Sequence, residues 1–527
     1  MTARTSERRA GFEVRRGIQE FLPLSARRSP DSVCMELPDG TRFTFEATNA
    51  RVNRLANALA EDGIGHGSRV ALMGVDSHRY FEACMAIMKL SATMVPLNFR
   101  LRRREVDTLL AKAEPAVLLH SDRYTELLEG IAESQPTLRQ VICFEDGYED
   151  VLTRGAETEP SNPRPDENDI AALAFTSGTT GLPKGVQQSF GMLTRLVSNN
   201  CIDYGPRSDD FWYCASPLFH VAGLAFPMMG IALGYRSLIL PQFGAETVLR
   251  HIDREDGLTA VFLVPTMIAS VLGVPGAREA DWSRLRLISY GSAPMSPALL
   301  TDVMNLAGCD FLNCFGAGTE AGSQTTLGPG EHRRALAGAT HLLGSIGKPA
   351  FGVELRLCDF DGNDVPRGEV GEIVTRSTTV MNGYLDMPEE TDRVFIGDGW
   401  FRGGDLAYMD DEGYLFLKGR SKDMIIRGGE NIYPVEIEHV LAEDPRIEYS
   451  AVVGVEDEHW GQTVRAWVLP VAGATITADE LTELCTRNLA KYKVPDEFVF
   501  VDDLPRNASG KVLKRTLVTW EPAEHAR

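Results

Sequence analysis

The hydrophobic positions up to about residue 165 follow a helix-then-strand order that repeats along the chain. RVNRLANALAEDG (51–63) places its apolar residues on one helical face, ends at Gly63 and precedes an apolar strand, RVALMG (69–74). The segment 80–98 repeats this order. Such alternation with short glycine-containing joints predicts βαβ units around a mainly parallel sheet.

The pattern changes twice further along the chain. PSNPRPDEND (160–169) is polar and rich in proline, which predicts a surface loop, and the helix–strand alternation then resumes to about 345. From 345 to 419, short alternating strands with Gly and Asp turns (353–359, 368–377 and 413–419) predict a small antiparallel or barrel-like unit. The last hundred residues predict a compact α+β piece with helices at 433–443 and 477–490.

Length, charge and cysteine spacing exclude several classes of protein. A chain of 527 residues is too long for one hydrophobic core, so we expect two or three units. The formal net charge of −21 disfavours a nucleic-acid partner, because such proteins normally carry a basic surface. The nine cysteines are scattered without a CxxC pair, which argues against a disulfide scaffold or a zinc site and favours a cytoplasmic location. We expect no transmembrane segment, because no apolar stretch of about 20 residues is uninterrupted.

The strongest local signal is ALAFTSGTTGLPKGV (172–186), an apolar strand that leads directly into glycines, hydroxyls and a lysine. Glycines allow the backbone amides to curl around an anion, and a lysine adds a point charge for distal phosphates. The lysine follows a proline, so this is not the P-loop of the nucleoside triphosphatases. The predicted phosphate-binding residues are Thr176, Ser177, Gly178, Thr179, Thr180, Gly181 and Lys184.

TSGTTGLPKG resembles the signature of the adenylate-forming superfamily, which includes acyl- and aryl-CoA synthetases, peptide-synthetase adenylation domains and firefly luciferase. Further matches follow in the order of that family between about residues 40 and 516. They are SPLFHVAG (216–223), YGSAP (290–294), FGAGTEAG (315–322), GWFRGGD (399–405), GRSKDMIIRGGENIYPVEIE (419–438) and PRNASGKVLKR (505–515).

The resemblance implies a fold and a division of the chain. It implies an α/β protein whose large N-terminal domain, residues 1–420, has parallel-rich sheets with helices and the small β-rich unit. Residues 421–527 would form a mobile α+β lid that carries Lys511, with a hinge near Lys422. Lys511 and Glu320 are the expected catalytic residues.

The resemblance also implies the ligands of ATP. Glu320 and Thr176 would hold Mg²⁺ beside Thr319, and the Glu320 loop follows the predicted strand CDFLNCF. Asp405 would bind the ribose hydroxyls and Arg420 the ribose or phosphate. The adenine would lie against three small residues and either Phe315 or Gly316; these small residues are Gly291, Ser292 and Ala293.

Three departures from the family pattern stand in these motifs. The family usually has YGxTE, with one residue between Gly and Thr, whereas FGAGTE has two. Phe315 and Gly316 are therefore alternatives for the residue that faces the adenine. Phe190 stands where a His is usual, and Gly403 stands where a Thr is common. The last change removes a hydroxyl near the phosphates.

Two further expectations concern the acid and its acceptor. His220 is either a gate beside the acyl pocket or a buried core histidine. No Asp or Glu lies between Ser216 and Gly234 to pair with an ammonium group, which argues against amino acids, and the apolar run at 221–234 suits an aliphatic or aromatic tail. In the second step the lid would bring in its coenzyme A-side loop, formed by Arg427, Gly428, Gly429, Glu430 and Asn431.

The sequence therefore predicts an acyl-CoA synthetase that uses ATP, Mg²⁺ and coenzyme A. It would convert a fatty or aryl acid to acyl-AMP with release of pyrophosphate, and then transfer the acyl group to coenzyme A. An amine or a carrier-protein thiol is the alternative acceptor, and an inactive homologue that binds the adenylate is the second alternative. The oligomeric state stays open, with a homodimer as one candidate.

Overall fold

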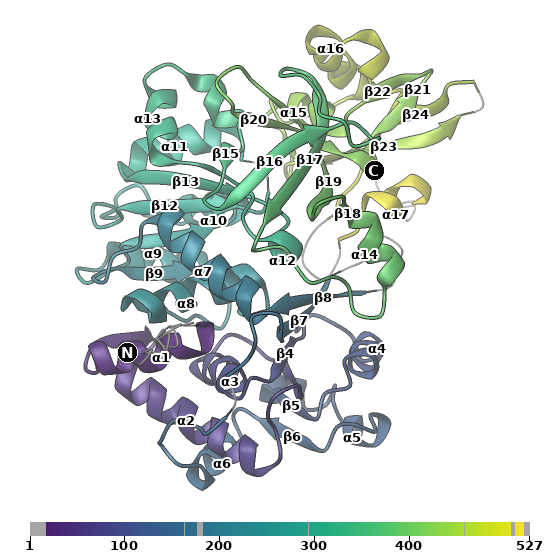
Figure 1. Cartoon of the computed structure of the whole chain (residues 1–527). Coiled ribbons are helices and arrows are strands. Elements are labelled where there is room, and N and C mark those ends of the chain that lie inside the picture. Colours follow the sequence, from purple (N-terminus) through teal and green to yellow (C-terminus); the bar gives the residue numbers. More distant parts are fainter. Residues whose placement is uncertain are drawn as a thin grey trace, which may run out of the picture.

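The computed structural model describes residues 17–162, 164–176, 183–293, 295–457, 459–506 and 512–520. One layer is a six-stranded sheet in the order β6-β5-β3-β4-β7-β8 (Figure 1). Neighbouring strands are parallel except for β7 and β8, which form an antiparallel pair. The strands are β3 (Arg69–Met73), β4 (Thr93–Pro96), β5 (Val117–His120), β6 (Gln140–Cys143), β7 (Ile170–Thr176) and β8 (Lys184–Ser189).

Helices cover both faces of this sheet. Val70 and Leu72 of β3 pack into the core cluster that holds α2 (Phe45–Glu61) and α3 (His78–Lys89). The alternate residues, Ala71 and Met73, pack with α4 (Arg103–Ala113) on the opposite face. Since side chains alternate along a strand, both faces are apolar and the strand reads as a continuous hydrophobic run. The predicted βαβ alternation is confirmed; α5 (Ile131–Ser134) and α6 (Tyr148–Arg154) complete this part.

The second layer is a nine-stranded sheet in the order β15-β14-β13-β12-β11-β9-β10-β1-β2. Its central strands are parallel, and β2, β14 and β15 add antiparallel edges. The strands are β1 (Val33–Glu36), β2 (Arg42–Thr44), β9 (Phe211–Cys214), β10 (Arg236–Leu238), β11 (Ala260–Leu263), β12 (Leu287–Gly291), β13 (Asp310–Phe315), β14 (Thr325–Leu327) and β15 (Lys348–Pro349).

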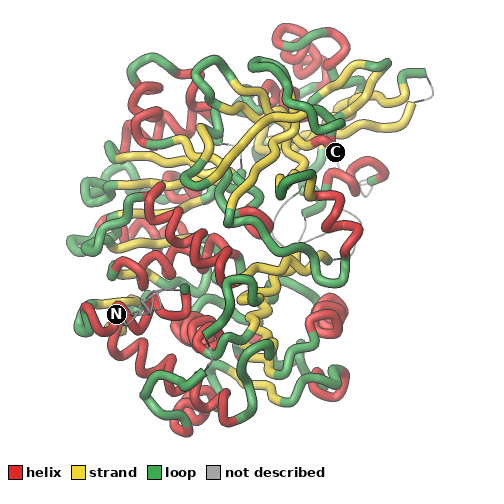
Figure 2. The backbone as a smooth tube through the Cα atoms, viewed as in Figure 1, coloured by secondary structure: helices red, strands yellow, loops and turns green. Residues whose placement is uncertain are grey.

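Helices flank these strands, as Figure 2 shows by the red coils beside the yellow layers. They are α1 (Phe21–Arg28), α7 (Phe190–Tyr204), α8 (Val221–Leu233), α9 (Ala245–Asp253), α10 (Pro265–Leu272), α11 (Pro297–Ala307), α12 (Gly318–Ala321) and α13 (Pro329–Leu336). One large buried cluster joins α3, α7 and α8 to both sheets, with Phe81, Trp212 and Met229 among its members.

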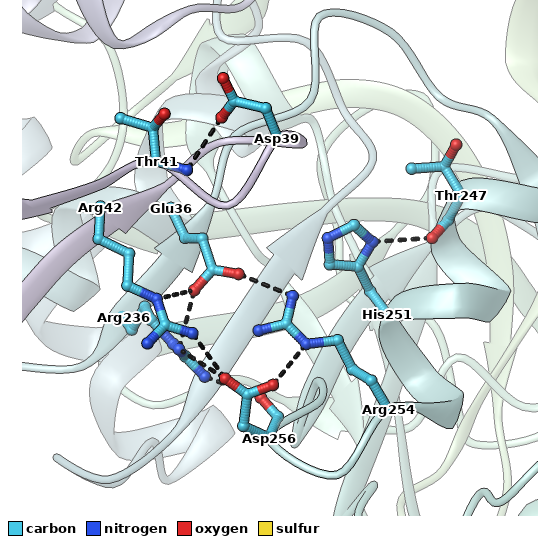
Figure 3. Close-up of polar contacts among 9 residues, drawn as sticks. All are labelled: Glu36, Asp39, Thr41, Arg42, Arg236, Thr247, His251, Arg254 and Asp256. Atoms are coloured by element: carbon cyan, nitrogen blue, oxygen red, sulfur yellow. Dashed lines mark hydrogen bonds and ion pairs between the residues drawn. The ribbon is translucent and has the colours of Figure 1, made fainter.

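A buried ion network fixes the β1–β2 edge of the nine-stranded sheet (Figure 3). The Glu36 side chain is fully buried, and its carboxylate lies 2.8 Å from nitrogens of Arg42, Arg236 and Arg254. Asp256 pairs with Arg42 and Arg254 at the exposed side of the network. Because a buried charge is costly unless it is paired, the network ties β1, β2, β10 and the end of α9 to one another.

A five-stranded antiparallel sheet follows in the chain, in the order β16-β17-β19-β18 with β20 paired to β19. Its strands are β16 (Val353–Cys358), β17 (Val370–Ser377), β18 (Phe395–Ile396), β19 (Trp400–Met409) and β20 (Leu415–Arg420), and α14 (Pro388–Val394) precedes β18. This is the small antiparallel unit that the strand and turn pattern predicts.

The C-terminal part is an α+β unit. It contains a three-stranded sheet of β23 (Ile447–Asp457), β24 (Gly461–Pro470) and β25 (Glu497–Phe500), and a hairpin of β21 (Ile425–Arg427) and β22 (Glu430–Ile432). Three helices accompany the strands, namely α15 (Pro434–Leu441), α16 (Ala478–Asn488) and α17 (Lys514–Thr519). Both helices predicted from the sequence are present.

The fold class is confirmed as α/β with large, parallel-rich sheets, a small β-rich unit and an α+β C-terminal part. In the part of the chain that the structure describes, no helix has the length and apolar character of a membrane span.

Candidate active site

The β7–β8 hairpin places two of the predicted phosphate-binding residues opposite each other. Thr176 at the end of β7 pairs in register with Lys184 at the start of β8. Side chains directly opposite each other on antiparallel strands leave from the same face of the sheet. The predicted residues Ser177, Gly178, Thr179, Thr180 and Gly181, which connect the two strands, lie outside the described residues.

Lys184 is surrounded by groups that the sequence motifs did not single out. Its Nζ lies 2.5 Å from a carboxylate oxygen of Glu390 on α14 and 4.7 Å from the ring centroid of Tyr384. The Lys184 ammonium lowers the pKa of Glu390 below its usual value. Glu389 and Glu390 lie in the first turn of α14, where the helix dipole favours acidic residues. The sequence therefore offers no reason to assign Glu390 to the site.

Glu320 lies on a short helix rather than in the predicted loop. Residues 318–321 form the single turn α12, because the Glu320 amide donates to the Ala317 carbonyl at 2.8 Å. Two neighbours fix this turn: the Gln188 side chain donates to the Thr319 carbonyl at 2.8 Å, and the Met381 amide donates to the Glu320 carbonyl at 2.7 Å. Gln188, on β8, is a second residue of the site that the motifs missed.

The Glu320 carboxyl group brings together the charged residues of the site. Burial raises its pKa to about 6, whereas the Arg420 and Lys184 charges and a hydrogen bond from the Thr176 hydroxyl lower it. These effects place Thr176, Lys184, Glu320 and Arg420 in one neighbourhood. The carboxylate and the hydroxyl are both hard oxygen ligands of the kind that Mg²⁺ prefers.

Asp405 and Arg420 form a second fixed pair, on β19 and β20. They stand opposite each other in register, and two guanidinium nitrogens of Arg420 donate to the two Asp405 carboxylate oxygens at 2.8 and 3.2 Å. The hydrogen bonds to Asp405 raise the pKa of Arg420, although burial opposes them. The arrangement orients Asp405, and each carboxylate oxygen has a further lone pair that can accept a hydroxyl group.

The small residues at the ends of β12 and β13 leave little room for side chains. A Cβ at Gly291 would lie 2.3 Å from the Cys314 carbonyl oxygen, and one at Gly316 would lie 2.1 Å from the Gly322 carbonyl oxygen. Ser292 has a φ of +66°, a left-handed conformation that is uncommon for a serine, and Ala293 follows it. Phe315 packs against the apolar cluster of the five-stranded sheet, which also contains Leu357 and Ile373.

His220 borders an apolar pocket with an open volume of about 390 Å³ between α7, α8 and the six-stranded sheet. Its ring stacks on Phe219 with the centroids 4.2 Å apart, and burial lowers its pKa to about 4. The other polar side chain of the lining is Gln188, which already donates to Thr319. Apolar residues complete the wall, among them Met94, Leu193, Leu196, Leu224 and Met228.

The predicted lid residues lie within the C-terminal unit. Lys422 belongs to a short 3₁₀ turn, Ser421–Asp423, directly after β20. The Arg427 guanidinium binds the Asp496 carboxylate at 2.6 Å and the Tyr492 carbonyl at 3.1 Å. Gly428 and Gly429 both have positive φ and form the two-residue turn between β21 and β22, followed by the exposed Glu430 and Asn431. Lys511 lies outside the described residues.

The chain matches known proteins over most of its length. The model of the "AMP-binding enzyme" family matches residues 22–385, and that of the "AMP-binding enzyme C-terminal domain" matches residues 436–511. A feruloyl-CoA synthase from Amycolatopsis sp is 37% identical over 94% of this chain and 98% of its own. An indoleacetate–CoA ligase from Aromatoleum aromaticum is 34% identical over 94% of this chain and 96% of its own.

A solved structure has the same fold. The o-succinylbenzoate coenzyme A synthetase of Bacillus subtilis, in complex with ATP and magnesium ion, superposes with a TM-score of 0.83 at 30% identity, over 94% of this chain and 99% of its own. The sheets, the pairing of the site residues and these matches lead to one conclusion. The chain belongs to the AMP-binding enzyme family.

Proposed function

We propose that this chain is an AMP-forming acid–CoA ligase. In the first step a carboxylate oxygen of the acid attacks the α-phosphorus of ATP and pyrophosphate leaves. In the second step the thiol of coenzyme A attacks the acyl carbonyl and AMP leaves. The observation that carries the proposal is the convergence of Thr176, Lys184, Glu320 and Arg420 on one site beside the apolar pocket. The retained set of charged residues argues against an inactive homologue.

ATP would bind along the ends of the strands. Residues 176–181 and Lys184 would hold the triphosphate, since Thr176 and Lys184 share one face of the β7–β8 hairpin. Asp405 would accept the ribose hydroxyls while Arg420 fixes its orientation. The adenine would lie beside Ser292 and Ala293, which directly follow the tightly packed Gly291 at the end of β12.

Magnesium fits the residues that the structure provides. Glu320 is a carboxylate whose pKa is raised by burial, and the Thr176 hydroxyl is its hydrogen-bond donor. A bound cation would favour the charged form of such a group. No cluster of three or more metal-ligating side chains occurs among the described residues, which suits Mg²⁺ because it binds through few protein ligands and substrate phosphates. When bound, Mg²⁺ would neutralise negative charge on the triphosphate.

Lys511 would supply the positive charge that the first step needs. An anionic carboxylate must approach an anionic phosphate, and a lysine near the bridging oxygens stabilises the charge that develops there. We assign residues 1–420 to the N-terminal domain and 421–527 to a lid that turns near Lys422. The lid would withdraw Lys511 after the first step and bring in the Arg427–Asn431 loop. Such domain motion is a gating step that can limit turnover.

The acid is proposed to be uncharged apart from its reacting carboxylate. Among the described residues the pocket lining carries no charged side chain, and His220 is neutral at pH 7 because burial lowers its pKa to about 4. A second carboxylate or an ammonium group would be buried there without a partner, which is costly. Aryl and aliphatic acids meet these conditions.

A panel of acids tests the proposal. The chain is incubated with ATP, Mg²⁺ and each acid, and AMP release is measured with coenzyme A, with an amine or with neither. We expect AMP release and acyl-CoA with neutral aryl or aliphatic acids, and little turnover with dicarboxylic or amino acids. Amide formation in place of the thioester would support the alternative acceptor. No acid-dependent AMP release with any acid would overturn the proposed function.

Two further predictions concern location and assembly. All nine cysteines are free thiols, which supports a reducing, cytoplasmic location. A homodimer is a candidate assembly, and light scattering of the purified protein measures it directly.

A further inference from the structure

Lys184 is paired with one carboxylate of the site and acts electrostatically on a second. Its Nζ contacts Glu390 at 2.5 Å, and its charge also acts on Glu320. Both partners of the contact are shielded from water, with 12% of the Lys184 side chain and 19% of the Glu390 side chain exposed. The Tyr384 ring lies beneath the ammonium at 4.7 Å and covers a further side of it. An anionic ligand that binds the Lys184 ammonium must therefore compete with the Glu390 carboxylate, which is already paired with it.

Glu390 is held relative to the strand that carries Lys184. Residues 382–385 run along β8, where the Leu385 amide donates to the Gly185 carbonyl at 2.8 Å and the Gln187 amide donates to the Gly383 carbonyl at 3.0 Å. The Thr391 hydroxyl of α14 accepts the Tyr384 amide at 2.9 Å. These bonds couple α14 to β8, so the Glu390 contact does not depend on a free surface side chain.

We propose that Glu390 is a resident counter-anion that competes with the triphosphate for the Lys184 ammonium. It pairs with Lys184 in the empty site, yields the lysine when ATP binds, and recovers it when pyrophosphate leaves. This inference rests on the proposed role of Lys184 in binding phosphate. The competition weakens the binding of ATP and pyrophosphate, and it speeds the departure of pyrophosphate.

Arg393 makes the exchange feasible. It lies one helical turn beyond Glu390 and pairs with the other carboxylate oxygen, and two thirds of its side chain is exposed. Glu390 therefore keeps a positive partner when Lys184 turns to the triphosphate, and no buried charge is left unpaired. Lys184 in turn exchanges the Glu390 carboxylate for the triphosphate.

Calorimetric titration with MgATP and with pyrophosphate, without acid or coenzyme A, tests the competition directly. Glu390→Gln keeps the shape of the side chain and removes its charge, so the dissociation constants for both ligands should fall about three- to tenfold. Glu389→Gln is the matched control, because Glu389 is 89% exposed and its ion pair among the described residues is a long one, to Arg393 at 4.0 Å. It should leave both constants unchanged.

A second variant, at the exposed Arg393, should change MgATP binding in the opposite direction. Arg393→Gln leaves Glu390 with Lys184 as its cationic partner, which strengthens the pair and should weaken MgATP binding severalfold. In a Lys184→Met background the effects of Glu390→Gln and Arg393→Gln should both vanish, because the competition acts through the lysine. Equal effects in that background would mean a general charge effect and would overturn the inference.

The remaining outcomes separate the inference from the function on which it rests. Unchanged or weaker MgATP binding by a folded Glu390→Gln protein would overturn the inference, while weaker binding by Lys184→Met alone would still support the phosphate role of Lys184. Unchanged binding by Lys184→Met would contradict that role itself. If Glu390→Gln does not fold, the sign of the Arg393→Gln effect decides the question.

Discussion

Asp405 and Glu320 are two carboxylates of one site in opposite surroundings. Asp405 receives two N–H donors from Arg420, which fix its orientation. Glu320 receives a hydroxyl, and burial raises its pKa to about 6. A carboxylate held in one orientation suits hydroxyl groups, and a buried carboxylate with a raised pKa suits a cation. This difference is consistent with the proposed roles of Asp405 at the ribose and Glu320 at the metal.

Glu320→Gln tests the metal assignment. The change keeps the shape of the side chain and removes one negative charge, so the apparent Mg²⁺ requirement should rise. Formation of acyl-AMP should slow by about 10²–10³, the usual cost of losing one electrostatic contact to a developing anion. Magnesium titrations of the first half-reaction measure both effects.

Thioester formation from supplied acyl-AMP is the internal control for this variant. It involves no pyrophosphate, so its rate should change little. A normal metal titration together with an unchanged first step would remove Glu320 from the metal site.

At the residue scale, the sequence motifs single out candidate site residues but not the residues that contact them. Thr176, Lys184, Glu320, Asp405 and Arg420 lie in recognisable motifs, and the structure brings them together. Gln188 and Glu390 act on them from outside those motifs, through one hydrogen bond and one ion pair. Such contacts depend on which segments the fold places side by side, and no local pattern reports them.

At the scale of the elements, the turn Ser421–Asp423 after β20 is the proposed pivot of the lid. Lys422→Pro would fix φ of this residue near about −65° and remove its N–H group. One half-reaction should therefore fall far more than the other, because the lid would favour one of its two orientations. Separate assays of acyl-AMP formation and of thioester formation measure this. Lys422→Ala, which keeps the backbone free, is the control, and equal, mild losses in the proline variant would place the pivot elsewhere.

The β1–β2 edge of the nine-stranded sheet gives a prediction about stability. Glu36→Gln leaves three arginines around a neutral side chain, and breaking a buried ion network typically costs about 3–5 kcal/mol in the free energy of unfolding. The urea midpoint of the N-terminal part should fall markedly. Asp39→Asn is the control, because Asp39 is exposed and its contact with the Thr41 amide survives the change. Equal midpoints for both variants would show that the network does not stabilise this edge.

Element boundaries were predicted less accurately than element types. The apolar pattern placed one helix at 51–63, whereas α2 begins at Phe45 because the Thr44 hydroxyl accepts the Ala47 amide at 3.1 Å. The predicted Glu320 loop is a helical turn closed by one hydrogen bond. A cap and a single turn each depend on one contact, which a pattern averaged over many residues does not resolve.

On the scale of the whole molecule, one site is proposed to perform two reactions with two sets of lid residues. Lys511 is proposed to act in the first reaction only, because charge builds between carboxylate and phosphate there. The second reaction has no such pair of anions. The proposed mechanism therefore separates the roles of the lid residues between the two half-reactions.

The most direct measurement compares both half-reactions of Lys511→Ala. The account predicts that acyl-AMP formation falls by about 10²–10³ while supplied acyl-AMP is still converted to acyl-CoA at nearly the original rate. Lys514→Ala is the control from the same basic tail, because Lys514 pairs with Glu438 at 2.6 Å within the C-terminal unit, and it should leave both rates close to those of the unchanged protein. Equal loss of both half-reactions in a folded Lys511→Ala protein would contradict the account.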